Sequence, residues 1–112
     1  MRKLIVPVLV AGLLGPAVAP AVAATKRVTV GDNFFVRKAG VPTVTVAKGD
    51  KVRWVWTGES LHNVKVTRGP ASFGSPSKTS GSFSKKVRKS GRYTIICTVH
   101  GASDQSMKLV VR

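Results

Sequence analysis

Cysteine, histidine and acidic residues are all scarce in this 112-residue chain. One cysteine cannot form a disulfide within the chain, although small domains in oxidising compartments often depend on disulfides. Four acidic side chains stand against 19 lysines and arginines, which gives a formal net charge of +15. Such a charge favours acidic partners or anionic surfaces. Two histidines and one thiol, with the thioethers of two methionines, are the whole inventory of soft and borderline metal ligands.

Aromatic residues are few as well, at 6% of the chain. Proteins that bind single-stranded nucleic acid stack bases on exposed aromatic side chains. The positive charges are also scattered, and only residues 85–89 approach a cluster. We therefore expect no nucleic acid partner, and a solvated basic surface that meets an acidic protein fits the composition better.

Residues 1–23 have the layout of a secretory signal peptide. A short basic start precedes an apolar run over 4–14, and the small residues Ala21 and Ala23 precede a cleavage site after Ala23 or Ala24. The run is shorter than the roughly 20 residues of a membrane span, so we expect no stable membrane span after processing. A retained N-terminal anchor is the alternative. The layout predicts an exported protein, periplasmic or extracellular.

Residues 24–112 would then form a single domain of 89 residues with 17 basic and 4 acidic side chains, a net charge of +13. A chain this small buries only a modest core. A bound metal would stabilise such a fold and give the single thiol a function, because binding free energy adds to folding free energy. We expect a monomer.

Short alternating apolar runs, separated by glycine and proline, fill this domain, and no stretch of it has helical periodicity. The pattern predicts an all-β Greek-key sandwich of about seven to eight strands. The runs at 51–57 and 93–98 are the most apolar and should be central, with Trp54 and Trp56 in the core. The predicted strands cover residues 27–30, 43–46, 51–57, 62–67, 83–87, 93–98 and 107–111.

The most informative apolar run ends in Cys97, and His100 follows three residues later. The other histidine, His62, lies far upstream on a different predicted strand. One thiolate, two imidazoles and a weak axial donor are the ligands of a mononuclear blue-copper site. The pattern therefore predicts that His62, Cys97 and His100 bind one copper ion. Taken singly, a cysteine at a strand end is more often a small buried apolar residue, and a lone histidine is more often a surface residue.

The joint pattern resembles the cupredoxins, the type 1 blue copper proteins, of the plastocyanin and amicyanin type. The matching motifs span the mature domain: Lys48-Gly49-Asp50 before a Trp-bearing strand, Leu61-His62-Asn63-Val64, Gly91-Arg92-Tyr93-Thr94 and Cys97-Thr98-Val99-His100. The resemblance implies that His62, Cys97 and His100 are the equatorial ligands. It also implies that Asn63 ties the His62 segment to the cysteine loop, and that the ring edge of His100 is the electron port.

The axial ligand departs from the family pattern. Plastocyanins place a methionine after Cys-x-x-His and four further residues, and here that position is Gln105. Met107 is two residues later, and it shares one face of the last predicted strand with Leu109 and Val111, as a core residue would. Gln105 is thus the axial candidate through its amide oxygen. Met107, or no axial protein ligand, remains the alternative.

These features favour a small electron carrier that cycles Cu(I) and Cu(II), makes or breaks no substrate bond and is therefore not an enzyme. Its basic surface would steer association with an acidic redox protein. Copper storage or delivery without electron transfer is the alternative, although no methionine-rich or histidine-rich tract supports it. A multicopper enzyme would need further histidines and a binuclear copper site a second cysteine. A metal-free basic adhesion module would make the ligand pattern a coincidence.

Overall fold

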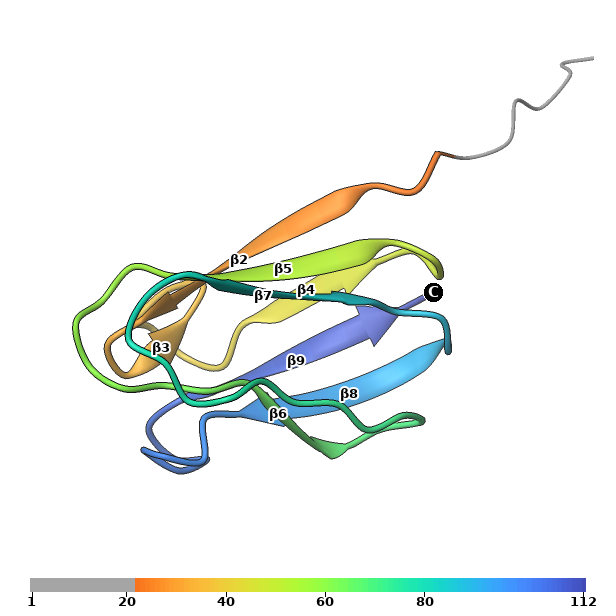
Figure 1. Ribbon diagram of the computed structural model, residues 1–112. Helices are drawn as coiled ribbons and strands as arrows, with labels where there is room; N and C mark the ends of the chain where they lie inside the picture. The colour runs from red at the N-terminus through yellow and green to blue at the C-terminus, as the bar shows by residue number, and fades with distance from the viewer. Residues whose placement is uncertain (1–21) are drawn as a thin grey trace, which may run out of the picture.

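The fold is a sandwich of two four-stranded sheets, seen in a computed structural model that describes residues 22–112 (Figure 1). The expected signal peptide over 1–23 lies, except for its last two residues, outside the described residues. Within residues 22–112 there is no helix long and apolar enough to cross a membrane. The strands are β2 (Thr25–Gly31), β3 (Phe34–Phe35), β4 (Thr43–Val46), β5 (Lys51–Trp56), β6 (Lys65–Arg68), β7 (Ser82–Lys86), β8 (Gly91–Ile96) and β9 (Ser106–Val111).

The sheets have the strand orders β3-β2-β5-β7 and β4-β9-β8-β6, so that consecutive strands repeatedly cross from one sheet to the other. Strands β2 and β5 are parallel, as are β4 and β9, and the remaining pairs are antiparallel. The predicted all-β sandwich of seven to eight strands is confirmed. The predicted central runs are confirmed too, because β5 and β8 each lie inside a sheet.

The core forms because the strands alternate with period two. In β5, Val52, Trp54 and Trp56 are buried while Lys51 and Arg53 are exposed, as expected for a strand with one face on the core. The Trp54 ring packs against Phe73 and Phe83, with ring centroids 5.9 and 5.8 Å apart. The last strand keeps the predicted parity, since Met107, Leu109 and Val111 are all buried.

One strand prediction was wrong in part. The run at 62–67 was expected to be continuous, but β6 begins only at Lys65, and His62 lies before it in an isolated bridge with Lys78. The connection at 69–82 causes this, because it returns alongside residues 62–66 and takes their hydrogen bonds. The backbone amides of His62 and Lys78 bond each other's carbonyl oxygens at 3.0 and 2.9 Å, and Ser75 donates to the Val64 carbonyl oxygen at 2.8 Å.

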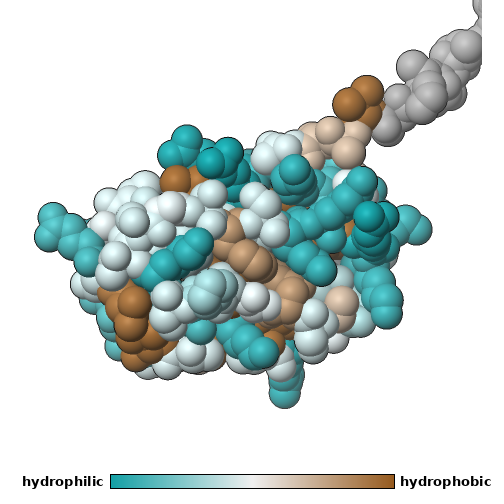
Figure 2. All heavy atoms as spheres, in the orientation of Figure 1, coloured by the Kyte–Doolittle hydropathy of each residue, from teal (hydrophilic) through white to brown (hydrophobic). Residues whose placement is uncertain are grey.

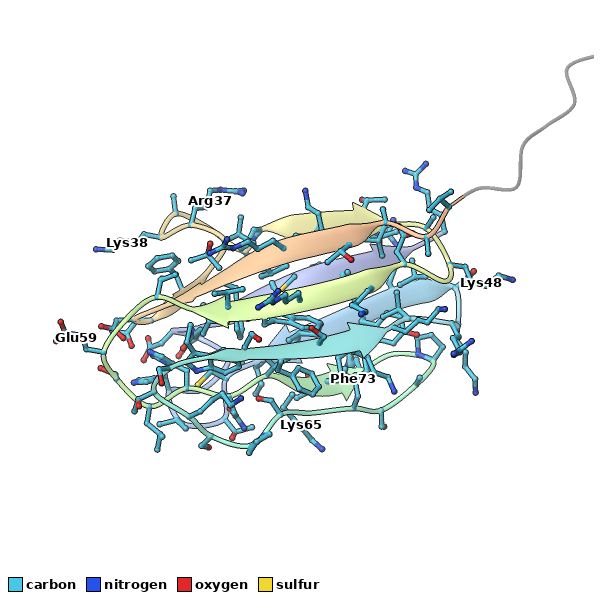
Figure 3. All side chains as sticks on the ribbon, turned by 45° about the horizontal axis from the view of Figure 1, so that its top comes forward. Arg37, Lys38, Lys48, Glu59, Lys65 and Phe73 are labelled. Atoms are coloured by element: carbon cyan, nitrogen blue, oxygen red, sulfur yellow. The ribbon has the colours of Figure 1, made fainter. Side chains whose placement is uncertain are left out.

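The acidic residues of the chain gather at one end of the sandwich. We call the end where β5 and β8 finish and β9 begins the cluster end. Figure 3 shows Glu59 at this end and Lys48 at the opposite one. Asp32 contacts the Glu59 segment, and Asp104 lies in the loop between β8 and β9. Three of the four acidic residues of the chain are therefore at the cluster end, and Asp50 is at the other.

Candidate metal centre

His62, Cys97 and His100 converge at the cluster end of the sandwich. The Cys97 Sγ lies 3.9 Å from His62 Nδ1 and 3.6 Å from His100 Nδ1, and ligand atoms from the three residues all lie within 4.8 Å of one another. His62 and Cys97 are fully buried, whereas His100 is partly exposed. The structure thus brings together three residues that sequence reasoning joined across a separation of 35 positions.

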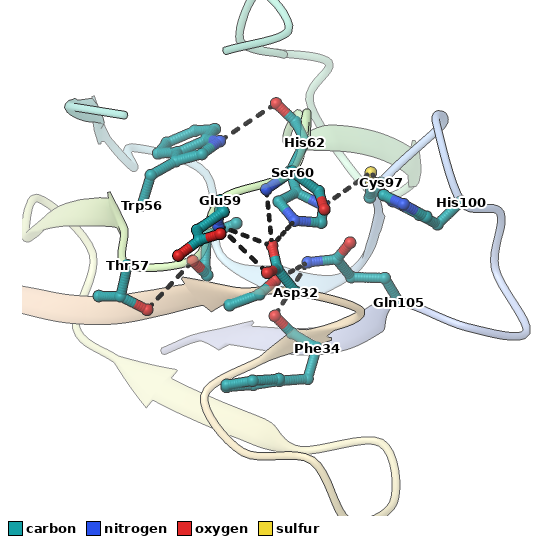
Figure 4. Close-up of polar contacts among 12 residues, drawn as sticks. Asp32, Phe34, Trp56, Thr57, Glu59, Ser60, His62, Cys97, His100 and Gln105 are labelled. Atoms are coloured by element: carbon teal, nitrogen blue, oxygen red, sulfur yellow. Dashed lines mark hydrogen bonds and ion pairs between the residues drawn. The ribbon is translucent and has the colours of Figure 1, made fainter. Parts of the chain in front are cut away.

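The backbone of His62 is fixed although it lies outside the named strands. Its amide and carbonyl groups pair with Lys78, and the carbonyl oxygen also accepts a hydrogen bond of 3.2 Å from the Trp56 indole Nε1 (Figure 4). Trp56 is the last residue of the central strand β5. The last residue of a core strand therefore helps to hold the His62 backbone in place.

The cysteine loop is a tight turn that continues the pairing of β8 with β9. Ile96 pairs with Ser106, and the next amide, that of Cys97, donates to the Gln105 carbonyl oxygen at 3.1 Å. Gly101 closes the turn with a φ of 88°, a value that favours glycine. Its amide donates to the Cys97 carbonyl oxygen at 2.8 Å. The turn returns the chain so that Gln105 stands opposite Cys97.

Asn63 joins the histidine segment to the cysteine loop. Its Nδ2 donates to Thr98 Oγ1 at 2.9 Å, and its Oδ1 accepts the Thr98 backbone amide at 2.8 Å. These paired bonds span the two sides of the cluster and limit how far His62 and Cys97 can move apart.

Gln105 and Met107 occupy different environments. Gln105 is 1% exposed, and its Nε2 donates to the carbonyl oxygens of Gly31 and Phe34 at 3.0 and 2.9 Å. Because two carbonyl oxygens surround this end of the side chain, the nitrogen and not the oxygen of the Gln105 amide must face them. The Oε1 atom therefore points away from these carbonyl groups. In Figure 4 it is turned toward the side of the site where His62 and Cys97 lie. This buried oxygen has no hydrogen-bond partner in the structure.

Met107 belongs to the core cluster instead. It is fully buried and pairs across the sheet with Ile95. This pair lies two residues further into the sheet than the position where Gln105 faces Cys97. Its neighbours in the last strand, Leu109 and Val111, belong to the same core.

Asp32 is a site residue that sequence reasoning missed, since Gly31-Asp32-Asn33 looks only like a turn. Its Oδ1 lies 2.8 Å from His62 Nε2, on the side of the ring that faces away from Cys97. The hydrogen bond with His62 holds the pKa of Asp32 well below its usual value, and the backbone amides of Ser60 and Glu59 add to this effect. No local signal could have identified it, because the contact joins positions 30 residues apart.

The donor set fits copper. A thiol and two imidazole nitrogens suit both Cu(I) and Cu(II), and a fourth weak oxygen donor suits the axial position of blue-copper centres. A buried polar atom without a partner is costly, so the unpaired Gln105 Oε1 is an independent sign that this space accepts a further group.

No protein-family model matches the chain, and no curated protein matches its sequence. Solved structures of amicyanin do match in fold. A Cu(I) form of a methionine-to-glutamine mutant of amicyanin has a TM-score of 0.65 and 25% identity, covering 79% of this chain and 82% of that chain. An oxidised proline-to-glycine mutant of amicyanin has a TM-score of 0.62 and 26% identity, covering 87% of this chain and 88% of that chain. The chain therefore has the cupredoxin fold, is similar to amicyanin, and carries a His-Cys-His cluster at one end of its sandwich.

Proposed function

We propose that the protein is a small exported electron carrier that binds one copper ion in a type 1 site through His62, Cys97 and His100. The observation that carries the proposal is the convergence of two imidazole Nδ1 atoms on one buried sulfur. Copper, when bound, supplies the one-electron Cu(II)/Cu(I) couple. Within residues 22–112 these three residues are the one group of three candidate ligands close enough to hold a metal ion.

We assign the axial position to the Gln105 amide oxygen. The β8–β9 register supports this assignment, because Gln105 stands opposite Cys97, and directly opposed residues of antiparallel strands share a face. The unpaired Oε1 supports it as well. An oxygen donor stabilises Cu(II) more than a thioether does, so the reduction potential should be lower than with a methionine in this position.

Rigidity is the main contribution of the protein to electron transfer. A site that changes little between oxidation states keeps the reorganisation energy small. The backbone pairing of His62 with Lys78, its bond from Trp56 and the Asn63–Thr98 bridge all restrict movement of the ligands. Full burial of His62 and Cys97 excludes water from that side of the cluster.

The partly exposed ring of His100 offers the route for electrons to leave. Two apolar side chains lie exposed near the ligands in the chain, with Leu61 at 45% and Val99 at 44% of their full exposure. Figure 2 shows an apolar patch at the cluster end, whereas hydrophilic side chains dominate the other end. Such a patch suits the close approach of a redox partner, and we propose an acidic protein as that partner because the net charge is strongly positive.

The proposal is tested by voltammetry of the protein reconstituted with one equivalent of copper. We expect a reversible one-electron wave over many cycles with no loss of copper to a competing chelator. A copper ion that leaves to the chelator whenever it is reduced would contradict electron transfer and favour the delivery function.

Charge steering is tested with small redox reagents in place of the unidentified partner. Electron exchange with anionic hexacyanoferrate should slow as ionic strength rises, because salt screens the attraction. Exchange with a cationic cobalt complex should become faster. Rates that do not change with ionic strength for either reagent would contradict electrostatic steering.

A further inference from the structure

We infer that Asp32 is a positioning residue for the metal ligand His62 and lowers the reduction potential of the site; this inference rests on the proposed copper function. The geometry places the Asp32 carboxylate 2.8 Å from His62 Nε2, while His62 Nδ1 faces the Cys97 sulfur. An ionised carboxylate only accepts hydrogen bonds. In the neutral imidazole Nε2 must therefore carry the proton, which leaves the Nδ1 lone pair free on the side of the cluster.

Asp32 is itself held in place. Its carboxylate accepts the backbone amides of Glu59 and Ser60 at 3.1 and 3.0 Å. Gly58 allows this approach, since a Cβ added there would meet the Asp32 backbone nitrogen at 2.9 Å and overlap its carboxyl group. The β2–β3 turn is thus fastened to the segment that leads into His62, and the carboxylate cannot swing away without breaking three contacts.

Two consequences follow for a metal bound at Nδ1. A carboxylate that accepts the distal proton makes the imidazole more basic and fixes the plane of its ring. Its negative charge also stabilises the more highly charged Cu(II) state relative to Cu(I). Asp32 should therefore lower the reduction potential and favour tight copper binding.

The first test needs no copper. Long-range ¹H–¹⁵N NMR of the copper-free protein at alkaline pH should find His62 as the Nε2–H tautomer. In Asp32→Ala the hydrogen bond is lost, and we expect a mixture of the two tautomers. A pure Nε2–H tautomer that persists in Asp32→Ala would overturn the inference whatever the protein does with copper.

The second test measures the reduction potential of copper-loaded variants. Asp32→Asn keeps an oxygen acceptor for His62 but removes the charge. Asp104→Asn is the matched control, because it removes one negative charge from the same end without a contact to His62. We expect the potential to rise in Asp32→Asn by clearly more than in the control, with the blue colour retained. Equal shifts would overturn the inference, whereas a colourless wild type would contradict the proposed function alone.

A different observation supports a second inference. We propose that the outer face of the β2-β5-β7 layer docks on an anionic phospholipid surface. Arg27 pairs directly with Arg53 across the sheet, and Lys51 pairs with Lys86 in the next row. All four side chains are exposed. We call these four residues the basic face. No acidic residue occurs in β2, β5 or β7.

The arrangement is unfavourable for an isolated protein. Like charges directly opposite one another destabilise a sheet, and here two such pairs lie in neighbouring rows. A layer of anions would remove the repulsion. The other outward residues of these strands are small, namely Thr25, Thr29, Val55, Ser82 and Ser84.

The chemistry of the basic face suits lipid headgroups better than it suits a nucleic acid or a protein. It offers no aromatic side chain on which a base could stack and no large apolar anchor of the kind that dominates protein interfaces. Lys51 and Arg53 also lie in the first half of β5, away from Trp56 and the His62 segment. A protein docked through this face would keep His100 free for a redox partner.

Vesicle sedimentation tests the inference with phosphatidylglycerol vesicles and, in parallel, with purely zwitterionic phosphatidylcholine vesicles. A quadruple variant changes Arg27, Lys51, Arg53 and Lys86 to Gln. The matched control changes four exposed cations of the other sheet, Lys65, Arg68, Arg92 and Lys108, to Gln.

We expect salt-sensitive binding of the wild type to phosphatidylglycerol only. Each contacting cation contributes roughly five-fold to the partition coefficient, so the quadruple variant should lose about a hundred-fold or more and the control far less. Equal losses in the two variants would show that net charge alone drives adsorption and would overturn the proposed face. Equal binding of the wild type to zwitterionic vesicles, or none to phosphatidylglycerol, would do so as well.

Discussion

The Asn63–Thr98 bridge predicts a measurable loss of stability in Asn63→Ala. The substitution removes two hydrogen bonds, of 2.9 and 2.8 Å. Each contributes about 1 kcal/mol, and an amide left without a partner adds to the loss, so we expect a free-energy change of about 2 to 3 kcal/mol. For a domain of this size that corresponds to a fall in Tm of about 8 to 24 °C. Thermal and urea unfolding of the copper-free protein measure it.

Thr98→Val is the matched control because it removes only the bond at Oγ1 and keeps the backbone amide. We expect it to lose about 1 kcal/mol. The double variant should lose no more than Asn63→Ala alone, because both substitutions remove the same bond. A loss below about 0.5 kcal/mol in Asn63→Ala, or full additivity in the double variant, would refute the bridge as a stabilising contact.

Two further predictions concern the last strand and the change of stability at acidic pH. Because Met107 lies in the core, Met107→Ala should lower the free energy of unfolding by about 2 to 5 kcal/mol. Met107→Leu should leave the copper spectrum unchanged, whereas Gln105→Leu should alter it. The opposite pattern of spectra would exclude Gln105 as the axial ligand. The backbone amides of Ala24 and Ala47 lower the pKa of Asp50, so its stabilising effect is present above the unfolded pKa of about 3.9 and is lost as pH falls through the lower folded pKa. The difference in urea midpoint between wild type and Asp50→Asn should therefore shrink below about pH 4, and a difference independent of pH would contradict this.

The fold could be predicted from the sequence because its central strands alternate cleanly. Val52, Trp54 and Trp56 recur at period two, which a buried strand face requires. The start of β6 could not be predicted in this way. His62 alternates with Val64 and Val66 as a strand residue would, yet its backbone forms hydrogen bonds with Lys78 in the long connection. Pairing between such distant segments leaves no local pattern in the sequence.

The three candidate ligands could be predicted because their residue types are rare in the chain. A single cysteine and two histidines leave one way to assemble a thiolate with two imidazoles. Asp32 gave no such signal, because aspartate is common in turns and its role depends on a contact with His62 across the fold. The opposition of Gln105 to Cys97 likewise depends on the β8–β9 register, which spacing alone suggests but does not determine.

The most direct test of copper binding by His62, Cys97 and His100 is a visible absorption spectrum of the purified mature domain after addition of one equivalent of Cu(II). We expect an intense thiolate-to-copper band that is missing in Cys97→Ser. A colourless or weakly coloured complex, or a band that survives in Cys97→Ser, would contradict a type 1 site at this cluster.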